Sequence, residues 1–322
     1  MRKTTFLSGI FSTGPLILAA ILLCRLTSLA QAVPAIPEPI VLWPDGAPQA
    51  KSSLPADVPL LIPFLPARVR TTTGILVIPG GGYVGLSLPT EGYEIAQFLN
   101  AAGIPAFVLK YRIAPRYRYP VQLQDGQRAM RYLRANAARY KLQLVGVAGF
   151  SAGGHLASQL GTTLEPADQN APDPLDRLSS RPDFMILGYP VIATPGFAAE
   201  GSLRNIDPNP AHPVNITRPD VVTNPPMAPQ LVDLLSTDLH VSKDTPPTFL
   251  VCADDDHSVF SENSVRFYLA LNHAGVPAEL HIYEHGRHGF GLAAWDPIDS
   301  TWTAHMLDWL RINNFLPAPV KP

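Results

Sequence analysis

A serine flanked by glycines gives the most specific chemical signal in this sequence. Ser151 is the centre of residues 149–153, which read Gly-Phe-Ser-Ala-Gly and match the pattern Gly-x-Ser-x-Gly. An apolar run at 144–148 precedes it, and a helix-like stretch begins at His155. In this pattern the serine occupies a sharp turn between strand and helix, and the glycines let neighbouring backbone approach closely. The pattern therefore predicts a nucleophilic serine, and because a pentapeptide of this kind also arises by chance, its context has to support it.

Three consecutive aspartates supply the candidate acid. A serine hydroxyl is a poor nucleophile at neutral pH, so it needs a base within hydrogen-bond reach and a third group that orients the base. In hydrolases with this serine turn the partners follow in the order Ser, Asp or Glu, His. Residues 254–256 are all Asp and come directly after the apolar run 248–252. We favour Asp256, because a turn after it would direct its carboxylate toward a histidine. Asp255 is the next candidate, and Asp254 and Asp255 also fit turn formers or helix caps.

His288 is the candidate base. It follows the apolar run 278–283, and it lies between Gly286 and Gly289, which suit a tight exposed loop. His285 is the nearest alternative. With Ser151 and Asp256 already assigned, the chain presents the three residue types of a catalytic triad in the expected order.

A triple glycine offers hydrogen-bond donors for the negative charge that develops when serine attacks an ester. Residues 79–83 read Pro-Gly-Gly-Gly-Tyr and follow the apolar run 75–78. In esterases such a glycine loop contributes backbone N–H groups together with the residue after the nucleophile. The predicted oxyanion hole is therefore formed by Gly81, Gly82 and Ala152. A plain tight turn would be the better interpretation of an isolated triple glycine, and a phosphate-binding loop would need a Lys-Ser/Thr ending that is missing here.

The elements that position these residues alternate between two kinds. Short runs that are apolar on both faces alternate with amphipathic stretches, which predicts a mostly parallel sheet covered by helices on both faces, an α/β fold. Ligands bind beyond the carboxyl ends of the strands in such a sheet, and every motif above follows a predicted strand. The predicted strands are 75–78, 106–111, 144–148, 184–189, 248–252 and 278–283, and the predicted helices are 91–102, 121–140, the stretch after Ser151, 263–273 and 301–312.

The order of these segments predicts one catalytic domain with two unusual parts. The α/β domain is expected to span residues 74–315, preceded by a proline-rich segment, 33–73, that lies extended on its surface. Residues 194–245 interrupt the alternation with Pro, Asn and Asp and contain one short helix-like piece at 228–235. A stretch of this length is often a lid or a binding loop, and a surface insertion without a role is the alternative.

The first 32 residues are expected to be an export signal. Arg2 and Lys3 give a positive start, residues 16–24 are continuously apolar, and Ala30-Gln31-Ala32 offers a cleavage site. The protein is therefore expected to be periplasmic or secreted. An uncleaved membrane anchor and a lipid-modified Cys24 are the alternatives.

Composition excludes several partners. The formal net charge is −2, and no basic run appears, which argues against nucleic acid and acidic membrane surfaces. Cys252 lies in an apolar run and is expected to be a buried, inert thiol without a disulfide partner after cleavage of the signal. No Cys/His cluster indicates a metal site, and the predicted chemistry needs no cofactor.

Six stretches of the chain carry a resemblance to a known family. They are 42–48, 79–83 with Glu91-Gly92, Tyr111-Arg112, 149–157, 246–256 and 278–292. In this order along the chain they resemble the α/β-hydrolases of the bifunctional feruloyl/acetyl xylan esterase-like family. Three features depart from the family pattern: Phe260 replaces a proline after the acid, Arg287 replaces a glycine before the histidine, and residues 193–229 are longer than usual.

The resemblance implies an exported carboxylic ester hydrolase that removes acetyl or feruloyl groups from plant polysaccharide such as xylan. It gives Ser151, Asp256 and His288 the roles argued above from position. Two alternatives stay open at this point. One is a serine peptidase of the same fold, and the other is a non-catalytic carbohydrate-binding protein that retains the hydrolase fold.

Overall fold

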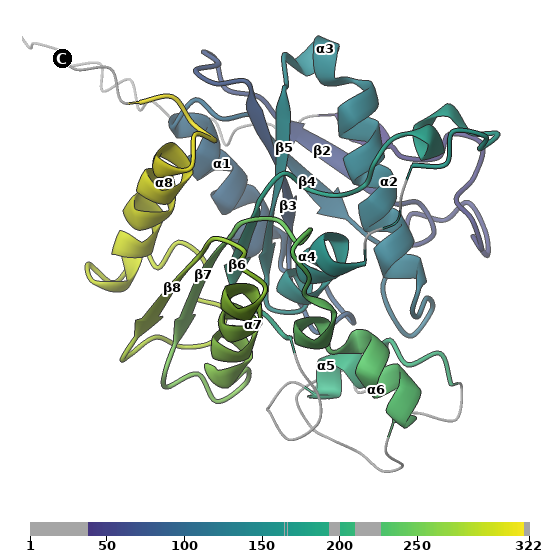
Figure 1. Ribbon diagram of the computed structural model, residues 1–322. Coiled ribbons are helices and arrows are strands. Elements are labelled where there is room, and N and C mark those ends of the chain that lie inside the picture. Colours follow the sequence, from purple (N-terminus) through teal and green to yellow (C-terminus); the bar gives the residue numbers. More distant parts are fainter. Residues whose placement is uncertain (1–37, 164, 166, 193–199, 210–226, 319–322) are drawn as a thin grey trace, which may run out of the picture. The chain divides into compact units, whose positions relative to one another are not determined.

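The computed structural model describes residues 38–163, 165, 167–192, 200–209 and 227–318 (Figure 1). The export signal expected at 1–32 lies outside the described residues, as do the first residues of the proline-rich segment and a large part of the 194–245 insertion. Among the helices in the described ranges, none is long and apolar enough to span a bilayer.

An eight-stranded sheet forms the centre of the α/β domain, with the order β1-β2-β4-β3-β5-β6-β7-β8. The strands from β4 to β8 along this order are parallel, whereas β2 is antiparallel to both β1 and β4. All six predicted strands are present. Their bounds are β1 (Ile40–Val41), β2 (Leu60–Phe64), β3 (Thr73–Ile78), β4 (Ala106–Lys110), β5 (Leu144–Phe150), β6 (Met185–Gly188), β7 (Thr248–Ala253) and β8 (Ala278–Tyr283).

Helices cover both faces of the sheet, as Figure 1 shows for α1 and α8 on one side and α2, α4 and α7 on the other. Strand side chains alternate between the two cores: Leu76 and Ile78 face one, Ile75 and Val77 the other. The predicted mostly parallel α/β fold is therefore confirmed. The helical elements are η1 (Leu88–Tyr93), α1 (Glu94–Ala101), α2 (Val121–Ala135), α3 (Ala137–Tyr140), α4 (Ala152–Thr162), η2 (Pro174–Arg177), α5 (Glu200–Asn205), α6 (Pro229–Leu235), η3 (Thr237–His240), α7 (Glu262–His273), η4 (Asp299–Thr301) and α8 (Trp302–Ile312).

The proline-rich segment contributes more than an extended surface chain. Two of its pieces, β1 and β2, join the edge of the sheet. Pro63, which lies within β2, pairs with Phe107 of β4. A proline lacks an N–H donor but is tolerated near the edge of a sheet. The prolines of this segment therefore did not prevent strand formation, although they made the strand hard to predict from the sequence.

Part of the 194–245 insertion is regular structure that is attached to the domain. The helix expected at 228–235 is α6, and the described portion also contains α5 and η3. The N–H of Tyr119 donates to the carbonyl of Ile206 at 2.9 Å, and the N–H of Thr237 donates to that of Ile192 at 3.1 Å. The described parts of the insertion are thus hydrogen-bonded to Tyr119 and to Ile192 of the domain.

The topology brings the predicted site residues to one edge of the sheet. The glycine loop follows β3, Ser151 follows β5, Asp256 follows β7 and His288 follows β8. Because these four strands are parallel, their carboxyl ends meet at the same edge.

Candidate active site

Ser151 occupies a strained turn between β5 and α4. Its backbone has φ 53° and ψ −123°, a conformation that side-chain-bearing residues rarely adopt. The neighbouring glycines make the turn sterically possible. A Cβ atom at Gly149 would lie 2.3 Å from the carbonyl oxygen of Gly153, and one at Gly153 would lie 2.2 Å from that of Ile78. The Gly-x-Ser-x-Gly pattern therefore reflects close backbone packing on both sides of the serine.

Ser151, His288 and Asp256 form a continuous hydrogen-bonded chain. Ser151 Oγ lies 2.8 Å from His288 Nε2, and His288 Nδ1 lies 2.6 Å from Asp256 Oδ2. The Asp256 side chain is 1% exposed and the His288 side chain 26%. Since the carboxylate accepts the proton on Nδ1, Nε2 of the neutral ring is left to accept the hydrogen bond from the serine hydroxyl. This arrangement can transfer the serine proton to the imidazole.

The three adjacent aspartates have different contacts. Asp256 Oδ1 accepts the N–H groups of Ser258 at 2.8 Å and Val259 at 3.0 Å, which leaves Oδ2 for His288. Asp254 accepts the hydroxyl of Ser261 at 3.1 Å. The structure thus places Asp256, and neither of its neighbours, against the histidine of the site.

The two alternative candidates, Asp255 and His285, pair with each other. Asp255 Oδ2 lies 3.4 Å from His285 Nδ1, and Asp255 Oδ1 accepts the N–H of Gly286 at 2.7 Å. The His285 side chain is 79% exposed. This pair fastens the loop two residues before His288 and lies outside the hydrogen-bonded chain to Ser151.

The glycine loop lies directly against the serine. A Cβ atom at Gly80 would lie 2.7 Å from Ser151 Cβ, and Gly81 and Gly82 have φ of 124° and 60°, which a glycine adopts readily. Within the described residues, the N–H groups of Gly81, Gly82 and Ala152 have no hydrogen-bond acceptor. Gly82 and Ala152 are buried. Buried N–H groups without an acceptor are rare, so this loop has donors available for a negatively charged oxygen.

Sequence reasoning missed one polar group of the site, the carboxylate of Glu91 in η1. Glu91 is 4% exposed, and burial raises the pKa of its carboxyl. Oε2 accepts the N–H of Gly80 at 2.7 Å, and Oε1 accepts the hydroxyl of Tyr189 at 3.0 Å. Glu91 had appeared in the sequence only as part of the family resemblance. Its partners are too distant along the chain for any local pattern to predict them.

Two of the departures from the family pattern are exposed near the site. Phe260 is 38% exposed, and the guanidinium of Arg287, directly before His288, stacks 4.5 Å from the ring of the exposed Trp295. Neither of these two side chains takes part in the hydrogen bonds that join Ser151, His288 and Asp256. Cys252 is buried in β7 as expected, and burial raises the pKa of its thiol to about 11, which keeps it protonated at neutral pH.

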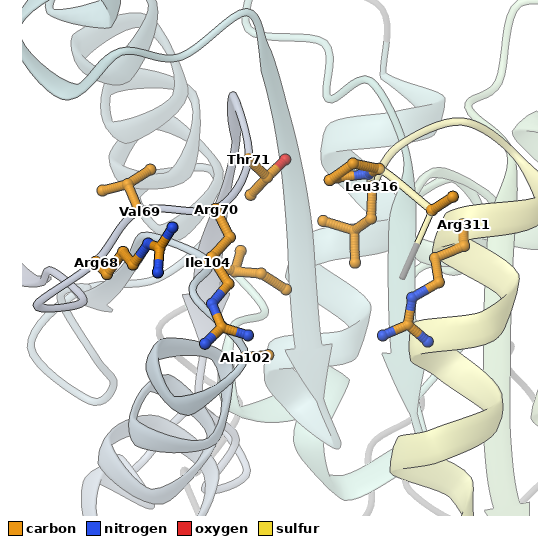
Figure 2. Close-up of a pocket in the computed structure, with 10 residues that line it drawn as sticks. Arg68, Val69, Arg70, Thr71, Ala102, Ile104, Arg311 and Leu316 are labelled. Atoms are coloured by element: carbon orange, nitrogen blue, oxygen red, sulfur yellow. The ribbon is translucent and has the colours of Figure 1, made fainter. Parts of the chain in front are cut away.

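A pocket of about 610 Å³ lies away from the triad (Figure 2). Residues 68–71 line it just before β3 begins, together with Ala102 after α1 and Arg311 in α8. It therefore lies near the amino end of β3, whereas the triad lies at the carboxyl ends of the strands. In the part of the chain that the structure describes, no group of three His, Cys, Asp or Glu side chains is arranged to hold a metal ion.

Comparison with known proteins relates this geometry to a family. A family model described as the alpha/beta hydrolase fold matches residues 75–292. An acetyl ester-xyloside bifunctional hydrolase from Caldicellulosiruptor lactoaceticus has a similar structure, with a TM-score of 0.76 and 39% identity, covering 88% of this chain and 99% of that one.

Two curated relatives are longer proteins. An acetylxylan esterase from Xylanibacter ruminicola is 31% identical over 265 residues, which cover 80% of this chain and 48% of the relative. An endo-1,4-beta-xylanase B from Butyrivibrio fibrisolvens is 32% identical over 237 residues, which cover 71% of this chain and 34% of the relative. The chain thus spans half or less of the length of these relatives. Together these similarities confirm the fold and the family resemblance expected from the sequence.

Proposed function

Because this chain belongs to the α/β-hydrolase family, we propose that it is a carboxylic ester hydrolase that acts through Ser151, His288 and Asp256. The observation that carries the proposal is the pair of short contacts from Ser151 Oγ to His288 and from His288 to Asp256, 2.8 Å and 2.6 Å long. Nucleophile, base and orienting acid are all within hydrogen-bond reach, as acyl transfer to serine requires.

The proposed reaction proceeds in two steps through an acyl-enzyme. Ser151 Oγ attacks the ester carbonyl carbon while His288 Nε2 accepts its proton, and Asp256 stabilises the imidazolium that forms. The N–H groups of Gly81, Gly82 and Ala152 bind the negatively charged oxygen; a single donor of this kind typically contributes about 3 kcal/mol to transition-state stabilisation. The imidazolium then protonates the departing alcohol, and a water molecule, activated by the same histidine, releases the acid from Ser151.

We infer further that the substrate is an acylated plant polysaccharide such as acetylated xylan. The support is the function named for the relatives: an acetylxylan esterase, a xylanase, and a hydrolase of acetyl esters and xylosides. A feruloyl group is the alternative acyl group. Purified protein should be compared on acetylated xylan, feruloylated arabinoxylan and p-nitrophenyl acetate, with a peptide substrate added to test peptidase activity.

The decisive experiment is the substitution Ser151→Ala. Because the hydroxyl is the attacking group, kcat on p-nitrophenyl acetate should fall by about 10⁶-fold, toward the residual rate that binding and the oxyanion donors support without the nucleophile. A fluorophosphonate probe should label the natural protein and not the variant. Undiminished turnover or labelling in the variant would refute the assignment and favour a non-catalytic protein or a different nucleophile.

We also propose that the protein is exported by its first 32 residues. The support is the charged start, the apolar run and the small residues around Ala32. Mass spectrometry of the protein recovered from the producing cells tests this. A mature chain that begins at Val33 supports export, and an intact or lipid-modified N-terminus contradicts cleavage at this site.

A further inference from the structure

Glu91 joins two loops of the site that are far apart in the sequence. Its Oε2 accepts the N–H of Gly80, at the start of the glycine loop. Its Oε1 accepts the hydroxyl of Tyr189, which follows β6. Both hydrogen bonds are buried, and the Glu91 side chain has almost no contact with solvent. One carboxylate therefore holds the backbone of the glycine loop on one side and the ring of Tyr189 on the other.

Tyr189 extends this connection to the loop of the catalytic histidine. Its hydroxyl accepts the N–H of Gly291 at 3.0 Å. Its ring packs edge-on against His288, with centroids 5.2 Å apart, and against Phe290 at 4.6 Å. Tyr189 has φ 35°, which is a strained backbone conformation for a residue with a side chain. The ring is held at this position in spite of that strain. The glycine loop and the histidine loop are thus held by one continuous buried network.

The donors and acceptors of this network indicate that Glu91 is ionised. The N–H of Gly291 already donates to the Tyr189 oxygen, so the single hydroxyl hydrogen of Tyr189 is free to donate to Glu91 Oε1. The N–H of Gly80 donates to Oε2. A proton on either oxygen would need an acceptor of its own, and both described hydrogen-bond partners of Glu91 are donors.

The charge of this carboxylate also acts on His288. Glu91 and His288 interact electrostatically, and a Cβ atom on Gly289, the next residue, would lie 3.7 Å from Glu91 Oε1. Tyr111 and Tyr189 also interact electrostatically with Glu91, and Asp256 interacts electrostatically with Tyr189. A buried negative charge near the imidazole stabilises the positive charge that the ring carries during serine attack.

We propose that Glu91 is a positioning residue for ester hydrolysis, and this rests on the function proposed above. Through Gly80 it fixes the glycine loop whose amides face the oxyanion. Through Tyr189 and Gly291 it fixes the loop of His288, and its charge stabilises the imidazolium. The two halves of the site, oxyanion donors and general base, are therefore aligned by the same side chain.

A stabilising role in folding alone predicts a different outcome. Burial raises the pKa of Glu91 above its ordinary value of 4.5. For an acid with a raised pKa, the contribution to stability is full below the unfolded value and is lost as pH rises through the folded value. Above that range the ionised carboxylate costs folding free energy. A neutral replacement removes this cost at pH 8, but its NH₂ group has to face either the Gly80 N–H or the Tyr189 hydroxyl. The two effects on stability oppose each other, so the loss of catalysis should exceed any loss of stability.

The test compares Glu91→Gln with Glu94→Gln, an exposed residue one turn further along the chain. For Glu91→Gln we expect kcat on p-nitrophenyl acetate to fall about tenfold or more with KM within about twofold, as loss of a single charge-assisted contact predicts. The Tm at pH 8 should stay within about 4 °C of that of the natural protein, and Glu94→Gln should behave like the natural protein in kcat, KM and Tm.

Tyr189→Phe adds a second test of the same network. It removes the hydroxyl that links Glu91 to Gly291 while it keeps the ring against His288. If the two residues act through one connection, the loss in kcat of the double variant with Glu91→Gln should be smaller than the product of the single losses. Multiplicative losses would contradict the shared network.

Other outcomes overturn the proposal without touching the triad. A natural kcat in Glu91→Gln would exclude a positioning role, and a loss of kcat with an equally large loss of stability would show that Glu91 acts only in folding. If Ser151→Ala abolishes turnover while Glu91→Gln does not impair it, only this inference fails. If Ser151→Ala remains active, the proposed function itself fails.

Discussion

Asp256 uses its two oxygens for different tasks. Oδ1 accepts the backbone N–H groups of Ser258 and Val259, and Oδ2 accepts the proton of His288 Nδ1. The first task shapes the turn after β7, and the second selects the tautomer of the catalytic ring. A substitution that preserves one task and removes the other separates folding from catalysis at a single residue.

Asp256→Asn makes that separation. The amide oxygen of asparagine retains the turn, whereas its NH₂ group faces His288 Nδ1 and favours the wrong tautomer. We expect kcat on p-nitrophenyl acetate to fall by about 10⁴-fold. The Tm should stay within about 4 °C, the shift that roughly 1–2 kcal/mol produces in a chain of this size.

Asp255→Asn is the matched control. Asp255 accepts the N–H of Gly286 and faces His285 at the surface, and its amide retains the acceptor. Its effect on kcat should stay within a few-fold. A large loss in this control, together with a small one in Asp256→Asn, would show that the acid has been assigned to the wrong aspartate.

The sequence could predict that Ser151, Asp256 and His288 come together because each lies beside a local signal, either a glycine pattern or the end of an apolar run. Glu91 gave no such signal. Its importance depends on partners 11 and 98 residues away, and on burial that only the packed fold creates. The choice of Asp256 over Asp255 was similarly an argument about a turn whose hydrogen bonds become visible only in three dimensions.

At the scale of elements, apolar periodicity predicted the strands from β3 to β8 and the large helices. Apolar periodicity did not predict the two strands at the edge of the sheet or the end of the helix after β4. The apolar run of strand β2 is only three residues long between Pro59 and Pro63, and β1 has only two residues, so neither resembles the longer apolar runs of the other strands. The single helix predicted at 121–140 is interrupted at Asn136, which separates α2 from α3.

Helix α4 is joined to two neighbouring elements by His155. This ring is fully buried: Tyr83 donates its hydroxyl proton to Nδ1 at 2.7 Å, and Nε2 donates to the carbonyl of Leu235, the last residue of α6, at 2.8 Å. One neutral imidazole thus connects the helix after Ser151 to the glycine loop and to the insertion. Burial lowers the pKa of His155 to about 4, so the neutral form is strongly preferred in the folded protein.

The lowered pKa predicts an acid-sensitive step in stability. With a folded pKa below the unfolded value, the contribution of His155 is full above about pH 6.5 and is lost as pH falls toward 4. The loss should reach about 3 kcal/mol. In urea titrations between pH 7 and 4, His155→Gln should flatten this decline, whereas the exposed His257→Gln should leave it unchanged. An equal decline in all three proteins would assign acid sensitivity to other groups.

At the scale of the whole molecule, the proline-rich segment is attached to the catalytic domain by a buried cation. The Arg112 guanidinium donates to the carbonyl of Pro48 at 2.6 Å and lies 5.7 Å from the ring of Trp43. It also pairs with Asp125 in α2, where Nη2 lies 2.6 Å from Oδ1 and the side chains are 1% and 0% exposed. Tyr111-Arg112 belongs to the family resemblance, and the structure gives the arginine a structural role remote from the triad.

Asp125→Ala should therefore destabilise the protein without altering its chemistry. Removing one partner of a buried ion pair leaves the other charge uncompensated, which typically costs about 3–5 kcal/mol. Urea unfolding should show this loss, while kcat and KM on p-nitrophenyl acetate, measured where the variant is fully folded, should match those of the natural protein. Asp308→Ala, which breaks the exposed ion pair with Arg311, should cost less than about 1 kcal/mol. A small effect of Asp125→Ala, or a changed KM, would mean that Arg112 has a second partner or that the segment it holds reaches the substrate.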